Sequence, residues 1–132
     1  MPTRPRSSNN STPIELPEFI DRADERPVVM LNLLDFKPGG GRERSEEYAE
    51  AVGPLLEQAG AKVIFAATAA APLIGPSEWD VVALVEYPTR RVFLEMVSSE
   101  KYLEIAHLRT EALDRSELHP LDRLPEGDAL AG

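Results

Sequence analysis

The amino-acid sequence predicts one α+β domain in which apolar strands alternate with amphipathic helices. Apolar runs without strict alternation, typical of strands buried on both faces, occupy residues 28–36, 61–75 and 78–87. Two further segments, 42–60 and 98–113, place apolar side chains at helical spacing. With 132 residues, the chain is long enough to bury a core without disulfides or metal ions.

The composition argues against several classes of function. With 14 basic and 23 acidic residues, the formal charge of −9 argues against a nucleic-acid partner and against an anionic membrane surface. The chain has no cysteine, which excludes disulfides and thiolate metal sites, and two histidines cannot form a three-histidine zinc centre. No apolar run approaches the roughly 18 residues of a membrane span. We therefore expect a cytoplasmic protein without a cofactor or a metal site.

The domain is expected to span residues 13–124, between disordered tails at residues 1–12 and 125–132. A helix-start signature follows the first tail, since Thr12 can cap a helix and Pro13 suits its first position. A short helical turn is predicted there, before the first strand begins after Pro27.

The first strand leads through a glycine-rich loop into a long helix. The three glycines of the KPGGG loop can adopt positive φ at little cost. The helix is predicted over residues 42–60, with Gly60 as its C-terminal cap. Pro54 lies inside this helix and is expected to kink it, because the carbonyl of Glu50 loses its donor.

The second half of the chain supplies two strands, two helices and a last strand. The second strand is predicted over residues 61–75, although its alanines favour helix. The third strand ends at Pro88, and Thr89 caps a short helix over residues 89–97. The long helix at 98–113 then precedes a closing edge strand over residues 116–124, in which Pro120 removes one donor.

The resulting order, β-α-β-β-α-α-β, is the ferredoxin-like split βαβ arrangement. It predicts a four-stranded antiparallel sheet with helices on one face. The strands are nevertheless apolar on both sides, so the second face of the sheet needs a cover that one chain does not supply. A homodimer that pairs the two sheet faces is the economical solution.

Four stretches of the sequence resemble the DUF1330 family of domains of unknown function: VVMLNLLDFK, PLLEQAGAKVIF, WDVVALVEYP and FLEMVSSEKYLEIAHLRTEAL. The resemblance covers about residues 27–119. It implies membership of the dimeric α/β-barrel superfamily, in which the sheets of two protomers face each other. It implies little chemistry, because relatives include cofactor-independent monooxygenases, small-ring isomerases, haem enzymes and stress-response proteins.

Arg109 is the strongest candidate for a ligand-binding residue. On a helical wheel it falls between Ile105 and Leu113 on the apolar arc that also contains Tyr102. A guanidinium there needs a partner, because unpaired burial costs several kcal/mol. One interpretation is an ion pair with Glu86, and the other is a clamp for the carboxylate or enolate of a small ligand. A third places the side chain past its neighbours in solvent.

His107 is the candidate catalytic residue, as a general base near neutral pH, or else a packing residue. The side chains of His107 and Arg109 diverge by about 160° on the helix, so both are not expected in one pocket.

Asn32 lies in the middle of an apolar strand, and a buried amide there must have partners. If it faces the helices, Asn32 could orient the carbonyl of a ligand. If it faces the partner, it sets the register of the dimer. Trp79, Tyr48 and Tyr102 are further ligand-binding candidates, although such aromatic residues more often belong to the core.

Two functions follow from these patterns. The first is a small cofactor-independent enzyme acting on an organic acid or an enolisable carbonyl compound, in a pocket between sheet and helices. The second is a non-catalytic dimer that binds a small molecule or serves as a stress-response module.

Overall fold

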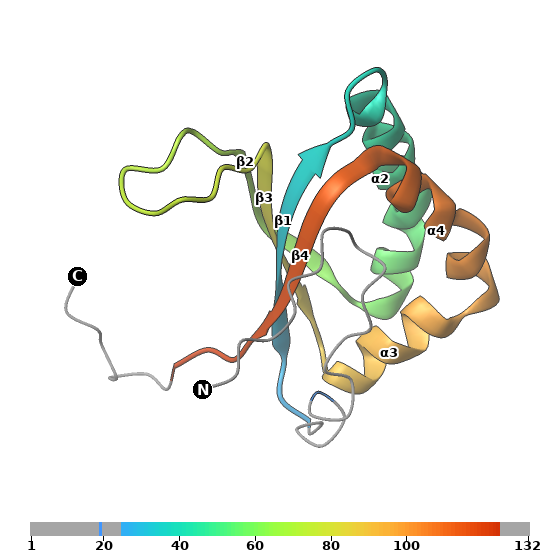
Figure 1. Ribbon diagram of the computed structural model, residues 1–132. Coiled ribbons are helices and arrows are strands. Elements are labelled where there is room, and N and C mark those ends of the chain that lie inside the picture. The colour runs from blue at the N-terminus through green and yellow to red at the C-terminus, as the bar shows by residue number, and fades with distance from the viewer. Residues whose placement is uncertain (1–18, 20–24, 125–132) are drawn as a thin grey trace, which may run out of the picture.

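The computed structural model describes Phe19 and residues 25–124, in which three helices cover one face of an antiparallel sheet (Figure 1). The predicted turn near Pro13 and the predicted tails lie outside these residues, and the limits of the domain stay a prediction. The elements are β1 (Val28–Phe36), α2 (Gly41–Ala59), β2 (Lys62–Thr68), β3 (Val81–Tyr87), α3 (Arg90–Ser98), α4 (Glu100–Ala112) and β4 (Leu113–Leu121).

The sheet has the strand order β2-β3-β1-β4, with every neighbouring pair antiparallel. This order and the helices on one face confirm the predicted ferredoxin-like α+β fold. In the described part of the chain, no helix is both long and apolar enough to cross a bilayer.

Alternation along the strands gives the sheet two different faces. The helix face carries Val28, Met30 and Tyr87, which form the buried core together with Phe19 and Met96. The outer face carries the intervening residues of the strands, with an apolar centre of Leu31, Leu33, Val82, Leu84 and Phe65. The helices do not cover this outer face (Figure 1).

Several element boundaries differ from the prediction. The third strand begins at Val81 instead of residue 78, and the last strand ends at Leu121 instead of residue 124. The second strand ends at Thr68 instead of residue 75, because three alanines of low β-propensity and then Pro72 follow. Residues 69–80 form a long connection, which we call the β2–β3 arm. The last strand begins at Leu113 instead of residue 116, directly after α4, since Ala112 and Leu113 are both buried at the junction.

A close backbone contact joins the start of α2 to the end of α4. The amide of Lys37 donates to the carbonyl of Ala112 at 2.8 Å, and the amide of Gly41 donates to the carbonyl of Lys37 at 3.0 Å. A Cβ atom at Gly41 would lie only 2.6 Å from the carbonyl oxygen of Ala112. Glycine at position 41 therefore permits α2 to begin here, while Gly39 and Gly40 supply the positive φ of the loop.

We expect Gly41→Ala to lower the free energy of unfolding by about 1 to 3 kcal/mol, because the added methyl group overlaps a backbone oxygen that cannot rotate away. Urea denaturation measures this loss. Gly53→Ala is the control inside the same helix, where the added Cβ meets nothing beyond its chain neighbours. Its gain in helix propensity is offset by the ring of Pro54, so a change below about 1 kcal/mol is expected. Equal losses in both variants would contradict the role given to Gly41.

Candidate functional site

Arg109 lies on α4 with its partly buried side chain directed at the helix face of the sheet. Its Nη2 atom donates to Oδ1 of Asn32 at 3.3 Å, and Nδ2 of Asn32 donates to the carbonyl of Met30 at 3.2 Å. Asn32 therefore faces the helices, which is the first of its two predicted orientations. The structure brings these two candidate residues together from positions 77 residues apart.

The predicted ion pair between Arg109 and Glu86 is wrong. Glu86 lies opposite Val29 in the sheet, on the outer face, and binds Nη2 of Arg123 at 3.1 Å. The reason is strand parity: Tyr87 faces the helices, so its neighbour Glu86 must face the other way.

Arg109 differs sharply from Arg90, the most deeply buried charged residue of the described chain. Arg90 is 1% exposed and makes a two-pronged ion pair with Asp122, with N–O distances of 3.0 and 3.1 Å. By contrast, no carboxylate among the described residues forms an ion pair with Arg109. Its partner is a neutral amide oxygen, so within the described part of the chain its positive charge has no balancing anion.

Tyr48 and Tyr102 meet beside Arg109. Their hydroxyl oxygens are 3.0 Å apart, and their rings are nearly perpendicular with centroids 6.4 Å apart. The hydroxyl of Ser99 caps α4 by accepting from the amide of Tyr102, which fixes where the helix begins. Arg109 follows Tyr102 by two helical turns and therefore lies on the same side of α4.

Tyr87, which sequence reasoning did not single out, completes the group. Burial raises the pKa of Tyr87, Tyr102 raises it further, and the charge of Arg109 lowers it. Burial likewise raises the pKa of Tyr48, as does its contact with Tyr102, while Arg109 lowers it. Strand alternation was the sequence signal that could have identified Tyr87. Residues two apart in a strand face the same way, and Val85 and Tyr87 both face the helices. The charge of Arg109 thus acts on both buried tyrosines, Tyr48 and Tyr87, and Tyr102 contacts the first of them.

We call this set the tyrosine–arginine cluster: Asn32, Tyr48, Tyr87, Tyr102 and Arg109. It combines one fixed positive charge with neutral groups that can donate hydrogen bonds. With Tyr48 and Tyr87 held protonated, the cluster offers donors and a cation but no anion. Such an arrangement suits a carboxylate, whose two oxygens can accept two parallel hydrogen bonds from a guanidinium. It also suits an enolate, whose one anionic oxygen can accept from an N–H or a hydroxyl group.

His107 and Trp79, the other candidate residues, lie apart from this cluster. His107 is exposed on α4. Trp79 lies at the base of the β2–β3 arm, where the guanidinium carbon of Arg115 is 3.9 Å from its ring centroid. The catalytic role of His107 and the ligand-binding role of Trp79 stay predictions.

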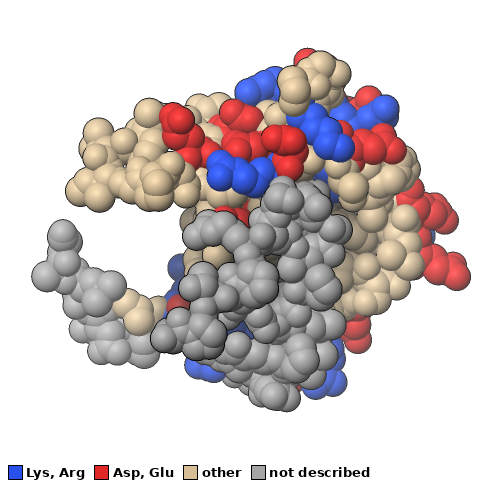
Figure 2. Space-filling view, in the orientation of Figure 1, with Lys and Arg blue, Asp and Glu red and all other residues tan. Residues whose placement is uncertain are grey.

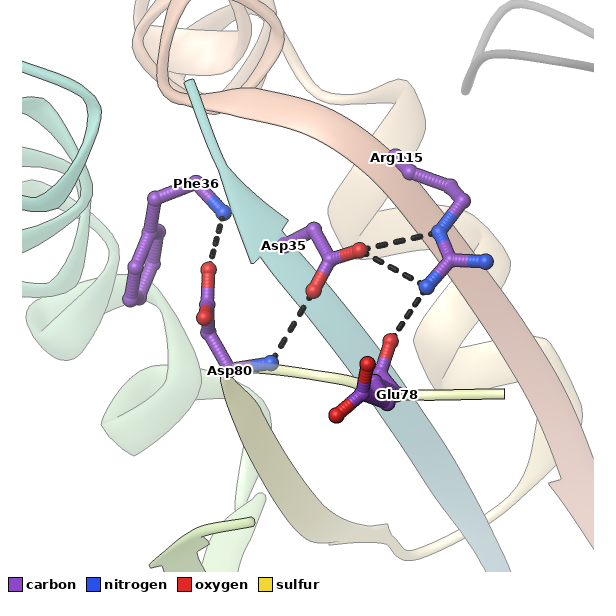
Figure 3. Close-up of polar contacts among 5 residues, drawn as sticks. All are labelled: Asp35, Phe36, Glu78, Asp80 and Arg115. Carbon is purple, nitrogen blue, oxygen red and sulfur yellow. Dashed lines mark hydrogen bonds and ion pairs between the residues drawn. The ribbon is translucent and has the colours of Figure 1, made fainter. Parts of the chain in front are cut away.

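A polar network surrounds the base of the arm (Figure 3). Asp35 accepts from Nε of Arg115 at 2.9 Å and from the amide of Asp80 at 3.0 Å. The carboxylate of Asp80 accepts from the amide of Phe36 at 2.8 Å, and Arg115 also donates to the carbonyl of Glu78. The network borders an open cavity of about 550 Å³. Across the described ranges, no group of three or more potential metal ligands occurs.

Residues 40–118 match the domain of unknown function DUF1330. The chain belongs to the DUF1330 family. The resemblance predicted over about residues 27–119 is confirmed across most of its length.

Solved structures agree with this assignment. A structure of the methylated RPA0582 protein is 30% identical with a TM-score of 0.84, and the match covers 92% of this chain and all of that one. A second structure of RPA0582, described as a protein of unknown function from Rhodopseudomonas palustris, is 31% identical with a TM-score of 0.81 and coverage of 88% and 98%. No curated protein matches this DUF1330 chain.

More distant structures share the fold. A dimeric ferredoxin-like protein of unknown function from Jannaschia sp. is 10% identical with a TM-score of 0.63, covering 74% of this chain and 99% of its own. Hydroxynitrile lyase from Passiflora edulis is 15% identical with a TM-score of 0.60, covering 74% and 94%. At these identities the likeness concerns the fold alone.

We expect the two arginines to respond differently to substitution. Arg90→Gln breaks the two-pronged ion pair between a fully buried guanidinium and the partly buried Asp122, and should lower the free energy of unfolding by about 2 to 4 kcal/mol. Arg109→Gln removes one long hydrogen bond to a neutral amide and should cost no more than about 1 kcal/mol. Urea denaturation of both variants checks this contrast. A loss at Arg109 as large as that at Arg90 would make Arg109 a structural residue.

The tyrosines predict a loss of stability in alkali. The folded chain holds protons on Tyr48 and Tyr87 that the unfolded chain releases above its ordinary tyrosine pKa of about 10. The free energy of unfolding should therefore be unaffected by these groups below about pH 10 and fall as the pH rises above it. Urea midpoints at about pH 8 and pH 11 measure the slope, which should be smaller in Tyr48→Phe. Equal slopes in wild type and variant would show that Tyr48 is not buried as described.

Proposed function

We propose that this DUF1330 protein binds a small organic acid, or an enolisable carbonyl compound, between the sheet and the helices and acts on it without a cofactor. The observation that carries the proposal is the unbalanced charge of Arg109. The same chain gives its buried Arg90 a carboxylate with two hydrogen bonds, whereas among the residues that the structure describes Arg109 bonds to the amide oxygen of Asn32 alone. A ligand carboxylate would supply the missing anion.

The hydroxyl pair gives the second contact with the ligand. In the contact between Tyr48 and Tyr102, one hydroxyl hydrogen lies between the two oxygens, which leaves the other hydrogen free to point elsewhere. That hydrogen can bind a carbonyl oxygen of a ligand whose carboxylate is held by Arg109. Asn32 helps to position the guanidinium through its oxygen.

The chemistry that these groups support best is enolate stabilisation. Solvent hydroxide takes a proton next to the carbonyl and becomes water, because the cluster itself holds no base. The negative charge moves onto the carbonyl oxygen, where a fixed hydroxyl donor and a guanidinium stabilise it. The hydroxyl of Tyr48 stays neutral, because burial holds its pKa well above the ordinary range.

A non-catalytic binding protein is the second candidate, and one observation favours it. Enolisation needs a base, and His107, the predicted base, is exposed on α4. The two candidates share the anion site and differ only in whether a proton is removed from the ligand.

We further propose that the protein is a homodimer joined through the outer face of its sheet. The apolar centre of this face supports the proposal, as does the ion pairing of Glu86 with Arg123 and of Asp35 with Arg115 at its margins. The Jannaschia protein of similar fold is described as dimeric. The cytoplasmic location expected from the sequence stays a prediction.

The binding proposal is tested by a thermal-shift screen of small monocarboxylic, dicarboxylic and 2-oxo acids. At saturating acid we expect the wild-type melting temperature to rise by about 4 to 8 °C, corresponding to roughly 1 kcal/mol of added stability. Arg109→Gln should abolish the rise, because the anion loses its cation. Arg91→Gln is the matched control, since Arg91 is exposed on α3 outside the cluster. The proposal fails if no acid shifts the wild type or if both variants lose the response equally.

Proton exchange separates the enzyme from the binding protein. The 2-oxo acid that binds best is incubated in deuterium oxide, and loss of the proton next to its carbonyl is followed by NMR. Faster exchange with wild type than with Arg109→Gln supports an enzyme, and Tyr102→Phe should slow it while binding persists. Binding without faster exchange supports the non-catalytic candidate.

A further inference from the structure

We propose that the β2–β3 arm packs its apolar tip against a second copy of the chain, on the side of the sheet that the helices leave open. This inference rests on the proposed homodimer and adds to it a second contact region outside the strands. The arm consists of residues 69–80 and joins the edge strand β2 to β3.

The tip of the arm carries two aliphatic side chains without any cover. Leu73 is 101% exposed and Ile74 is 95% exposed, more than the other large apolar residues that lie at the surface. Figure 1 shows the arm projecting from the sheet on the side opposite to the helices, and Figure 2 shows it standing clear of the body of the molecule. Its exposed tip and the apolar outer face therefore lie on the same side.

The base of the arm is fixed, although its tip is free. The amide of Ala69 donates to the carbonyl of Asp80 at 3.0 Å, and the amide of Asp80 donates to the carbonyl of Leu34 at 2.9 Å. Arg115 adds its bond to the carbonyl of Glu78 and lies over the ring of Trp79 (Figure 3). Prolines at positions 72 and 76 restrict φ on both sides of the tip. An arm held in this way loses little conformational entropy when its tip binds.

Charge on the open side of the sheet suits a second copy of the same chain. Among the described residues, the outer face and its margins carry three acidic and three basic residues, and the base of the arm adds the acidic Glu78 and Asp80; the chain as a whole has a formal charge of −9. Most of the acidic excess therefore lies elsewhere, so the repulsion between two open sides is weak. The three acidic and three basic residues of the outer face and its margins are Asp35, Glu86, Glu117, Lys62, Arg115 and Arg123.

The size of the sheet favours a contact that includes the arm. Four strands about 4.8 Å apart, of seven or nine residues and therefore roughly 23 to 30 Å long, present a flat area of roughly 440 to 570 Å². A standard stable interface removes about 800 Å² of surface from each partner. The arm extends the contact beyond the strands, and two-fold symmetry lets each copy contribute the same arm to the other.

Sedimentation equilibrium over a range of protein concentrations tests the inference. The variant is the double substitution L73S/I74S, whose positions are exposed in the single chain, so the fold should be unchanged by circular dichroism. Because four aliphatic side chains per dimer would return to water, we expect the dissociation constant of the dimer to rise by at least about 100-fold. The control is Leu103→Ser, which removes a side chain 62% exposed on α4. It should leave the constant unchanged.

The outcomes distinguish the contribution of the arm from the existence of the dimer. A dimeric wild type whose L73S/I74S variant dissociates, while Leu103→Ser does not, supports the inference. A dimeric wild type with an equally tight variant overturns the role of the arm and leaves the homodimer standing. A wild type that stays monomeric at all concentrations overturns both. Emission from Trp79, the single tryptophan, should change on dilution of the wild type if the arm is released.

Discussion

The contact between Gly41 and Ala112 sets the position of the two helices that build the candidate site. The carbonyl of Ala112 accepts from Lys37 while the backbone of Gly41 passes beside it, so α2 begins where α4 ends. The two helices consequently run antiparallel across the same face of the sheet and form the main contact among the helices. Tyr48 lies two turns into α2, and Tyr102 lies near the start of α4. Their hydroxyl contact depends on this single point of close approach.

The two inward-facing arginines, Arg90 and Arg109, differ in the partners that their guanidinium groups bind. Arg90 ties the start of α3 to Asp122, just beyond β4, and its charge is balanced within the chain. Arg109 occupies a similar position between helix and sheet but contacts an amide and lies near tyrosines, so no described carboxylate balances its charge. Unbalanced charge in a partly buried place costs free energy, and this cost is the basis of the anion site proposed for Arg109.

Much of the fold followed from the sequence, because hydrophobic patterning decides which segments are strands and which are helices. The inward direction of Arg109 also followed from helical spacing. The partner of Arg109 could not be predicted from the sequence. Glu86 and Tyr87 are adjacent, and only the register of β3 against β1 decides which of the two faces the helices. The end of β2 was missed because alanine gives a weak signal. The ion pair of Arg90 was missed because its partner is 32 residues away.

The direct passage from α4 into β4 connects the two faces of the sheet without a loop. Ala112 ends the helix, Leu113 begins the strand, and both are buried, so no flexible joint separates the two elements. Arg109 lies on the helix side of this junction, and Arg115 lies six residues later, holding Asp35 and Trp79 on the opposite face of the sheet. The candidate site and the base of the arm are therefore joined by one continuous stretch of regular backbone, with no loop between helix and strand.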